Sequence, residues 1–533
     1  MPIKLVSLYR LAIQWLLGSL ILRGFIAGMN WVVELSRGSF IVGLFAANDT
    51  PQQENIRRSI FVRLADKILN GIPKPIRMPA RWPCALSNLS TGSSLIRNFT
   101  DRLDTPVPPP VPNTNAGMVI LWGLYALPIW ALLVVIIGLP VLPTMVLAGM
   151  LVPAFIFALF SRRFVLDGTA VFLLLFIVIS VAAALMSVAP ATSLPVAAIS
   201  IAFMLSTILI VACAKTRHSV NMLITGFVIA AAITGLVGMY QVFTGYRTHG
   251  AWLDMILFVD IGLRLPSTFG NPNVFGTYLL LAIPVTAGCV VYAKKLVLKL
   301  AALGITGLLL ANLLATYSRG CYVSLAIGAL AFVLIIRKEL VVAFIPALLG
   351  VLLILPTTVV ARIASIANFE DTSTAYRLNI WRGSLRMLAD FWPAGVGQGE
   401  YAFNMVYTYY SLGAIVTPHS HNLFMQIFIE TGIVGFLVFI GVLACFFRAH
   451  ANFVRRTKEL RLKVFSASFV AAAVGFLAQG MFDYNFYNYS VRLAFFMFMG
   501  IGIAFTRVAA DGDSQIQEET EPRESEWVKG YHD

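Results

Sequence analysis

The chain has 533 residues, of which 59% are hydrophobic and only 12% charged, and its formal net charge is +14. A soluble domain needs roughly a quarter of its residues charged, so the composition excludes that class and predicts an all-α polytopic membrane protein. Excess lysine and arginine are typical of the cytoplasmic loops of such proteins, so the charge does not indicate a nucleic-acid partner.

Residues 1–116 form a separate basic region that ends in the Pro-rich linker at residues 105–112. A short pattern recurs in it, a small polar residue followed by large apolar residues, at 18–25, 38–45, 58–65 and 93–99. We expect short amphipathic helices that contact anionic membrane lipids from the cytoplasmic side. The alternatives are a disordered tail, or a single span at 11–29, which Arg23 disfavours.

Residues 117–507 are expected to be the transmembrane domain, because they contain repeated apolar runs long enough to cross a bilayer. We predict about twelve spans, at 118–139, 141–160, 169–188, 195–213, 221–242, 273–293, 298–315, 320–336, 339–361, 421–447, 464–481 and 490–507. Residues 508–533 are expected to form an acidic cytoplasmic tail.

Basic residues are concentrated in every second connection, and those connections are short. The positive-inside rule therefore places both termini in the cytoplasm of a multi-pass protein. The loops 243–272 and 362–420 then face outward, and the second is a large extracytoplasmic loop before the tenth span. The residues that could carry chemistry lie in or beside these loops.

Arg264 lies just before the predicted span that begins at Asn273, which we expect to cap that helix. A guanidinium near a helix N-terminus is a natural seat for phosphate, although Asp260 could neutralise it instead. Arg319 lies in a very short connection, where it either extends to the lipid headgroups or lines a cavity.

The large outer loop contains a predicted amphipathic helix around Tyr376–Leu385. Arg377 lies at its beginning, where a basic residue is unfavourable, and this favours contact with an anion. Trp381 is expected to lie at the membrane surface. The Gly-rich segment 395–399 permits a tight turn, which we interpret as structural first.

His421 lies where the tenth span begins, and the partial positive charge of a helix N-terminus keeps an imidazole neutral. It is therefore a candidate general base, whereas His419 fits a loop hydrogen-bonding role better. Glu430, nine residues further on, could orient a histidine, hold an arginine or be purely structural. No acidic cluster accompanies the histidines in the loop, so a catalytic metal is not expected.

Taken together, these segments resemble the O-antigen ligase and polymerase superfamily of bacterial membrane glycosyltransferases. The resemblance covers roughly residues 200–505, and its motifs are 264–276, Ser318-Arg319-Gly320, Tyr376-Arg377 with Trp381, 395–399, and His421-Asn422 with Glu430 and Gly432. The residues 1–116 have no counterpart in the usual ligase.

The resemblance implies a GT-C-like fold in the bacterial cytoplasmic (inner) membrane and transfer of a glycan from undecaprenyl diphosphate to an acceptor hydroxyl. It implies inversion at the transferred sugar, with no metal and no cofactor. Arg264 and Arg377, with Arg319 as a further candidate, would bind the diphosphate, and His421 would be the base, although His419 leaves that choice open. Glu430, Asn422, Trp381 and Asn273 would support the site.

The acceptor does not follow from the resemblance and could be a lipid, a glycan or a protein. A polymerase of the same superfamily would share these motifs. A transporter of lipid-linked glycans would also suit twelve spans, but transporters usually place their ionisable residues near the midplane of the membrane. A scaffolding role for residues 1–116 could coexist with catalysis. Tyr407, Tyr409 and Tyr410 are candidates for sugar contacts.

Overall fold

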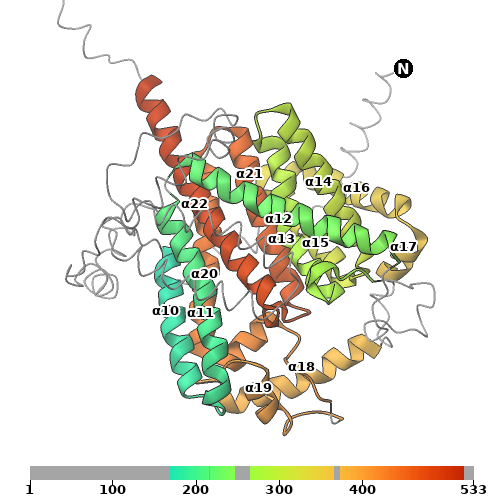
Figure 1. Ribbon diagram of the computed structural model, residues 1–533, viewed down its shortest axis with the longest axis vertical. Helices are drawn as coiled ribbons and strands as arrows, with labels where there is room; N and C mark the ends of the chain where they lie inside the picture. Colours follow the sequence, from blue (N-terminus) through green and yellow to red (C-terminus); the bar gives the residue numbers. More distant parts are fainter. Residues whose placement is uncertain (1–167, 215, 246–263, 365–371, 414, 521–533) are drawn as a thin grey trace, which may run out of the picture.

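The structure is a computed structural model that describes residues 168–520 except 215, 246–263, 365–371 and 414. The described part is a bundle of helices, several of which run almost the full height of the molecule (Figure 1). Nine of them are long and apolar enough to cross a membrane. They are α10 (Gly168–Leu185), α11 (Pro190–Cys213), α12 (Arg217–Phe243), α13 (Pro272–Tyr292), α14 (Leu296–Ala315), α15 (Arg319–Ile336), α20 (Leu423–Arg456), α21 (Leu460–Gly480) and α22 (Tyr489–Thr520).

These nine helices confirm nine of the predicted spans, and the chain is a multi-pass membrane protein. The predicted spans 118–139 and 141–160, and the amphipathic segments within 1–116, lie outside the described residues. The prediction of a span at 339–361 was wrong, because two shorter helices occupy it, α16 (Val341–Ile354) and α17 (Thr357–Ala364). Leu355 is extended between them (φ −73°, ψ 149°), since the residue before Pro356 is disfavoured in the helical region.

With 14 residues, α16 is about 21 Å long, which is short of a hydrocarbon core about 30 Å thick. Nine of the twelve expected spans are thus confirmed and the exact count is not, since two of the others lie outside the described residues. At the other end of the chain, α22 continues to Thr520, well past the expected start of the tail.

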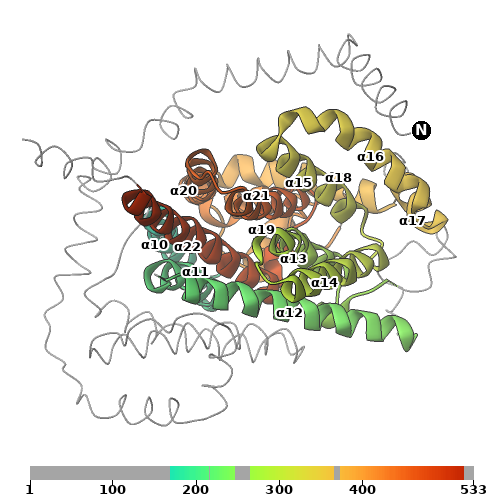
Figure 2. The ribbon, with the colours of Figure 1, turned by 90° about the horizontal axis from the view of Figure 1, so that it is seen from above.

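The centre of the bundle consists of α13, α20, α21 and α22, with α10 and α11 packed along one side and α12, α14 and α15 along the other (Figures 1 and 2). The helices approach each other most closely where small residues lie between them. A Cβ atom on Gly328 of α15 would lie 2.5 Å from the carbonyl oxygen of Ala471 in α21. Such contacts let helix backbones pack tightly where no hydrophobic driving force exists between helices in lipid.

One end of the bundle carries two further helices, α18 (Thr372–Phe391) and α19 (Glu400–Tyr407), which lie together at the bottom of Figure 1. The first confirms the helix predicted around Tyr376–Leu385. The two helices have a small apolar core of their own, which includes Ile380, Met387, Val396, Phe403, Tyr407 and Ile429. This core fixes α18 and α19 to the beginning of α20, to which Ile429 belongs.

Helix α20 is broken at Gly432, whose backbone (φ 68°, ψ −176°) is accessible in practice to glycine alone. The chain at 392–396 inserts at the break, where the Val396 amide donates to the Ile429 oxygen at 2.8 Å and the Ile433 amide donates to the Trp392 oxygen at 2.9 Å. A Cβ atom on Gly395 would lie 2.5 Å from the Ile429 oxygen. The Gly-rich segment is thus structural, and it holds the helix turn that carries Glu430.

Candidate active site

Two loops meet at the end of the bundle that carries α18 and α19. Residues 417–422 lead into α20, and residues 481–488 join α21 to α22. Asn422 connects them, because its Oδ1 accepts the Met425 amide at 2.9 Å as the N-cap of α20, while its Nδ2 donates to the Met481 oxygen at 2.8 Å. Asn422 thus joins residues 417–422 to residues 481–488, and we call these two connected loops the platform.

His421 is held on this platform in an unusual backbone conformation, with φ 50°. Non-glycine residues adopt such values rarely, and they cluster at functional sites. Its Nδ1 lies 3.0 Å from Oδ1 of Asp483, and Trp381 Nε1 donates to its backbone oxygen at 3.3 Å. Trp381, for which the resemblance implies a supporting role, thus contacts the histidine loop, residues 417–422.

Asp483 also accepts the Tyr484 amide at 2.9 Å, so its carboxylate is fixed in place. Burial by itself raises the pKa of Asp483, but the hydrogen bond from His421 and the charges of His421 and Arg377 outweigh it. The net pKa of Asp483 is well below its ordinary value, and the group remains an anion. It therefore accepts the proton on Nδ1 of His421 and leaves the lone pair on Nε2 able to take a proton.

His419 has a different environment, although it lies only two residues away. Its side chain is buried, its Nδ1 accepts the His421 amide at 3.3 Å, and its ring stacks on Tyr487 with centroids 4.8 Å apart. The pKa of His419 falls to about 3, chiefly because burial disfavours the charged ring, with further lowering by the charges of His421 and Arg377 and an opposing effect of Asp483. His419 is therefore neutral near pH 7 and supports the loop.

Of the three arginines expected to bind diphosphate, Arg377 is the one whose charge acts on the residues around the histidines. Arg377, in the first turns of α18, is close enough for its charge to lower the pKa of both His419 and Asp483. Arg264 is buried, and its Nε donates to the Thr316 oxygen at 2.9 Å. Arg319 begins α15, and the following residue, Gly320, packs against the amide of Gln479, four residues before Asp483.

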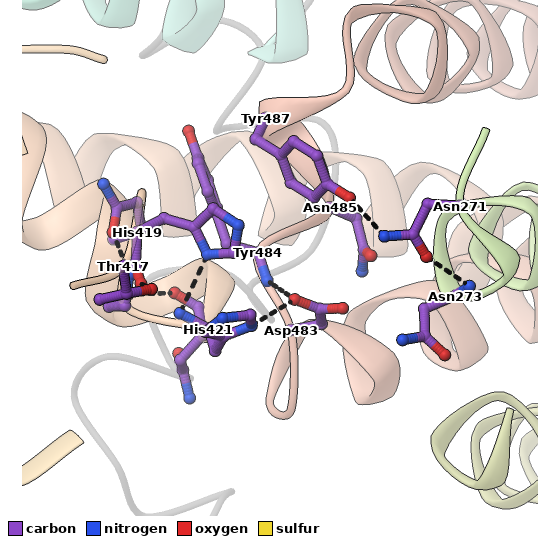
Figure 3. Close-up of polar contacts among 12 residues, drawn as sticks. Asn271, Asn273, Thr417, His419, His421, Asp483, Tyr484, Asn485 and Tyr487 are labelled. Atoms are coloured by element: carbon purple, nitrogen blue, oxygen red, sulfur yellow. Dashed lines mark hydrogen bonds and ion pairs between the residues drawn. The ribbon is translucent and has the colours of Figure 1, made fainter. Parts of the chain in front are cut away.

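The expectation that Asn273 caps the helix after Arg264 was wrong. The N-cap of α13 is Asn271, whose Oδ1 accepts the Asn273 amide at 2.9 Å, because Pro272 occupies the first helical position. Asn273 instead accepts from Arg264 Nη2 at 2.9 Å. Asn271 Nδ2 donates to the Tyr487 hydroxyl at 3.1 Å, so the Arg264 segment is connected to the loop 481–488, whose Tyr487 stacks on His419 (Figure 3).

Glu430 does not orient either histidine. It is buried, and it accepts from Gln426 Nε2 at 3.0 Å and from the Tyr484 hydroxyl at 3.3 Å. The same hydroxyl accepts from Arg492 Nη2 at 3.3 Å. Glu430 is thus joined through Tyr484 to an arginine that the sequence did not single out.

A cavity of about 450 Å³ lies beside this network. It is lined by Thr192, Val196, Gln398, Gly399, Glu400, Tyr401, Pro418, His419, Gln426, Glu430, Tyr484, Tyr487, Tyr489 and Arg492. The tyrosines suggested for sugar contacts do not line it. Tyr407 packs against Phe403 in the apolar core of α18 and α19, and the Tyr410 hydroxyl donates to Asp390 Oδ2 at 2.6 Å.

Among the described residues, His419, His421 and Asp483 form the cluster that could hold a metal ion, with ligand atoms within 4.8 Å of one another. Two imidazoles and a carboxylate are a donor set that zinc accepts, but its ligand atoms lie about 3.3 Å apart in a tetrahedral site. Nδ1 of His421 and Oδ1 of Asp483 lie 3.0 Å apart and share a hydrogen bond, and an ion bound there would displace the shared proton.

Asp483, Tyr484, Tyr487 and Arg492 were missed as site residues. The first three lie between two predicted spans, in a segment rich in aromatic and polar residues from Met481 to Tyr489, and Arg492 lies at the beginning of the second of these spans. An aspartate in a connection expected on the outer face was the available signal.

Residues 304–440 match the family model described as O-antigen ligase. The matched part contains Arg319, Arg377, Trp381, His419, His421, Asn422 and Glu430, and it leaves out Arg264, Asn273 and Asp483. A search of curated proteins found no match to the chain. The match at residues 304–440 supports the resemblance of this chain to the O-antigen ligase superfamily.

Proposed function

We propose that this protein transfers a glycan from undecaprenyl diphosphate to an acceptor hydroxyl at the outer face of the bacterial cytoplasmic membrane, without a metal and with inversion. The observation that supports it most directly is the pairing of His421 Nδ1 with Asp483 Oδ1 at 3.0 Å. His421 lies inside the segment that matches the O-antigen ligase model, and Asp483 lies after it in the chain. The pairing is the arrangement by which a carboxylate orients a histidine base.

In the proposed step the acceptor oxygen forms a bond to the anomeric carbon, while the bond from that carbon to the diphosphate oxygen breaks. The acceptor proton moves to Nε2 of His421, and Asp483 stabilises the resulting imidazolium. The lipid diphosphate leaves as an anion. A single displacement of this kind inverts the configuration of the sugar.

Arginine takes the role that a metal has in many transferases that act on diphosphates, since its planar, permanently charged group matches phosphate oxygens. Arg377 is favoured for direct contact because it is partly exposed and lies near the histidine pair. Arg264 is held by Thr316 and Asn273, so in the proposal it contributes a fixed positive charge.

A polysaccharide polymerase would use the same residues, with a second lipid-linked glycan as the acceptor. The product distinguishes the two activities, because a polymerase yields a ladder on a gel and a ligase yields a single shift.

The test uses the full chain purified in detergent, with an undecaprenyl-diphosphate-linked glycan, candidate lipid, glycan and protein acceptors, and EDTA throughout. We expect the wild type to release undecaprenyl diphosphate. The rate of release by His421→Ala should be about 10²–10⁴-fold lower, which is the range for loss of a positioned general base. Correct folding of the variant is checked by size-exclusion chromatography. Failure of the wild type with a donor and acceptor that a control enzyme uses would contradict the proposal.

A further inference from the structure

The 450 Å³ cavity is separate from the proposed reacting atoms but shares a wall with them. His419 lines the cavity, and its ring also lies 4.3 Å, between centroids, from the ring of His421. In Figure 3 Tyr484 and Tyr487 lie on one side of the His419 ring, and His421 and Asp483 lie on the other. A molecule in the cavity would therefore lie beside the His421–Asp483 pair.

Three charged residues line the cavity; Glu400 is exposed, whereas Glu430 and Arg492 are buried and are fixed before any ligand binds. Glu430 is held by Gln426 and Tyr484. Arg492 is buried, and it donates to the Phe486 oxygen at 2.6 Å and to the hydroxyls of Ser200 and Tyr484. One buried negative and one buried positive group face the same space, so the cavity suits a neutral, polar molecule better than an anion. Preorganised polar groups of this kind give orientation and specificity.

The remaining walls are aromatic. Tyr401, which is 59% exposed, lies at the rim, and Tyr484, Tyr487 and Tyr489 contribute rings further along. Aromatic rings with polar tips pack against the C–H face of a pyranose, while amides and carboxylates bond its hydroxyls. A volume near the lower end of ordinary ligand pockets, about 300–1,000 Å³, is suited to one or two sugar rings.

We propose that this cavity is a pyranose subsite, which holds one sugar of a glycan next to the His421–Asp483 pair. The biological role of this subsite rests on the proposed function, whereas the binding test does not. The sugar comes from the acceptor glycan or from the reducing end of the donor, and both sources present the same chemistry to the cavity.

The first test is direct binding. Saturation-transfer NMR on the full chain uses methyl α-D-glucopyranoside, methyl α-D-galactopyranoside and methyl α-D-mannopyranoside at millimolar concentration, in a detergent without a sugar headgroup. The blocking variant is Thr192→Trp, at an exposed position on the cavity wall, and the matched control is Ala191→Trp, an exposed neighbour that does not line the cavity.

We expect saturation transfer to at least one methyl glycoside in the wild type and in Ala191→Trp, and its loss in Thr192→Trp. Transfer in none of the three proteins, or equal transfer in all of them, would overturn the subsite. Because no glycosyl transfer is needed, this result stands even where the proposed function fails.

The second test identifies the source of the sugar. With a competent donor and acceptor pair, Thr192→Trp should raise the KM of one substrate by about ten-fold, equivalent to 1.4 kcal/mol, with kcat changed less. A raised acceptor KM assigns the subsite to the acceptor, and a raised donor KM assigns it to the donor. Unchanged KM values for both substrates would overturn the subsite while leaving the transferase activity established.

Discussion

Nδ1 of His421 lies 3.0 Å from Oδ1 of Asp483, although 62 residues separate the two in the chain. One belongs to the loop before α20 and the other to the loop after α21. The contact fixes which ring nitrogen carries the proton, and it leaves Nε2 of a partly exposed histidine as the basic atom. The proposed chemistry depends on this relationship.

Replacing Asp483 by asparagine should lower kcat by about 10²–10⁴, because the amide can donate to Nδ1 and so favour the wrong tautomer of His421. The release of undecaprenyl diphosphate measures the rate. Asp390→Asn is the matched control, since Asp390 is exposed on α18 and bonds Tyr410 away from the histidines. An Asp483→Asn variant with wild-type kcat would remove the aspartate from the mechanism.

Arg377→Ala should lower kcat/KM for the lipid-linked donor by about 10²-fold, the usual cost of removing one group that stabilises developing negative charge. Arg377→Lys should recover part of the loss, because lysine supplies charge without the planar fork. Arg382→Ala, at an exposed position on the same helix, serves as the control. Equal losses in Arg377→Ala and Arg382→Ala would mean that Arg377 acts only through general surface charge.

His419→Asn should retain kcat within about ten-fold of the wild type, because the asparagine oxygen can still accept the His421 amide as Nδ1 of His419 does. His421→Ala should be far slower in the same assay. The comparison decides which histidine is the base. A larger loss in His419→Asn than in His421→Ala would reverse the assignment.

The sequence predicted the membrane helices well, because each must bury about 20 apolar residues and that requirement is local. It predicted the site only in part. Arg377, Trp381, His421 and Asn422 lie in one continuous segment and were recognised together. Asp483 comes from another loop, and its pairing depends on how α20 and α21 pack.

Two of the errors concern signals that were present in the sequence. Pro356 disfavours a helical Leu355 and so divides the predicted span 339–361. Pro272 is favoured at the first helical position, which makes Asn271 the cap and frees Asn273 for Arg264. The cavity could not be predicted, because its walls come from α11, residues 398–401, the loop residues Pro418 and His419, α20 and the segment 484–492.

Stability should fall as the pH drops below about 6.5. The pKa of His419 is lowered to about 3 in the folded protein, and the ordinary value is 6.5, so between these values the unfolded chain binds more protons. This contribution is complete above the unfolded pKa and is lost toward the folded one, at up to about 1.4 kcal/mol per pH unit.

Asp483 adds to the loss of stability at low pH, because its pKa in the folded protein is also below the ordinary value of 3.8. This further loss begins as the pH falls to about 3.8. Thermal melting from pH 7.5 to 4.5 measures the effect of His419, and His419→Asn should flatten the decline. A variant with the same pH dependence as the wild type would show that His419 gains its proton without unfolding.

Gly432→Ala should lower the melting temperature and the transfer rate together. The φ of 68° with ψ of −176° costs a side-chain-bearing residue about 1–3 kcal/mol, and a Cβ atom would lie 2.3 Å from the Pro393 oxygen. The inserted segment 392–396 would have to move, which shifts Glu430 and the cavity wall beside it. Gly304→Ala in α14 is the control, because nothing lies within 4 Å of the added Cβ atom there. Melting of Gly432→Ala within a degree of that control would show that the break in α20 is not held by this glycine.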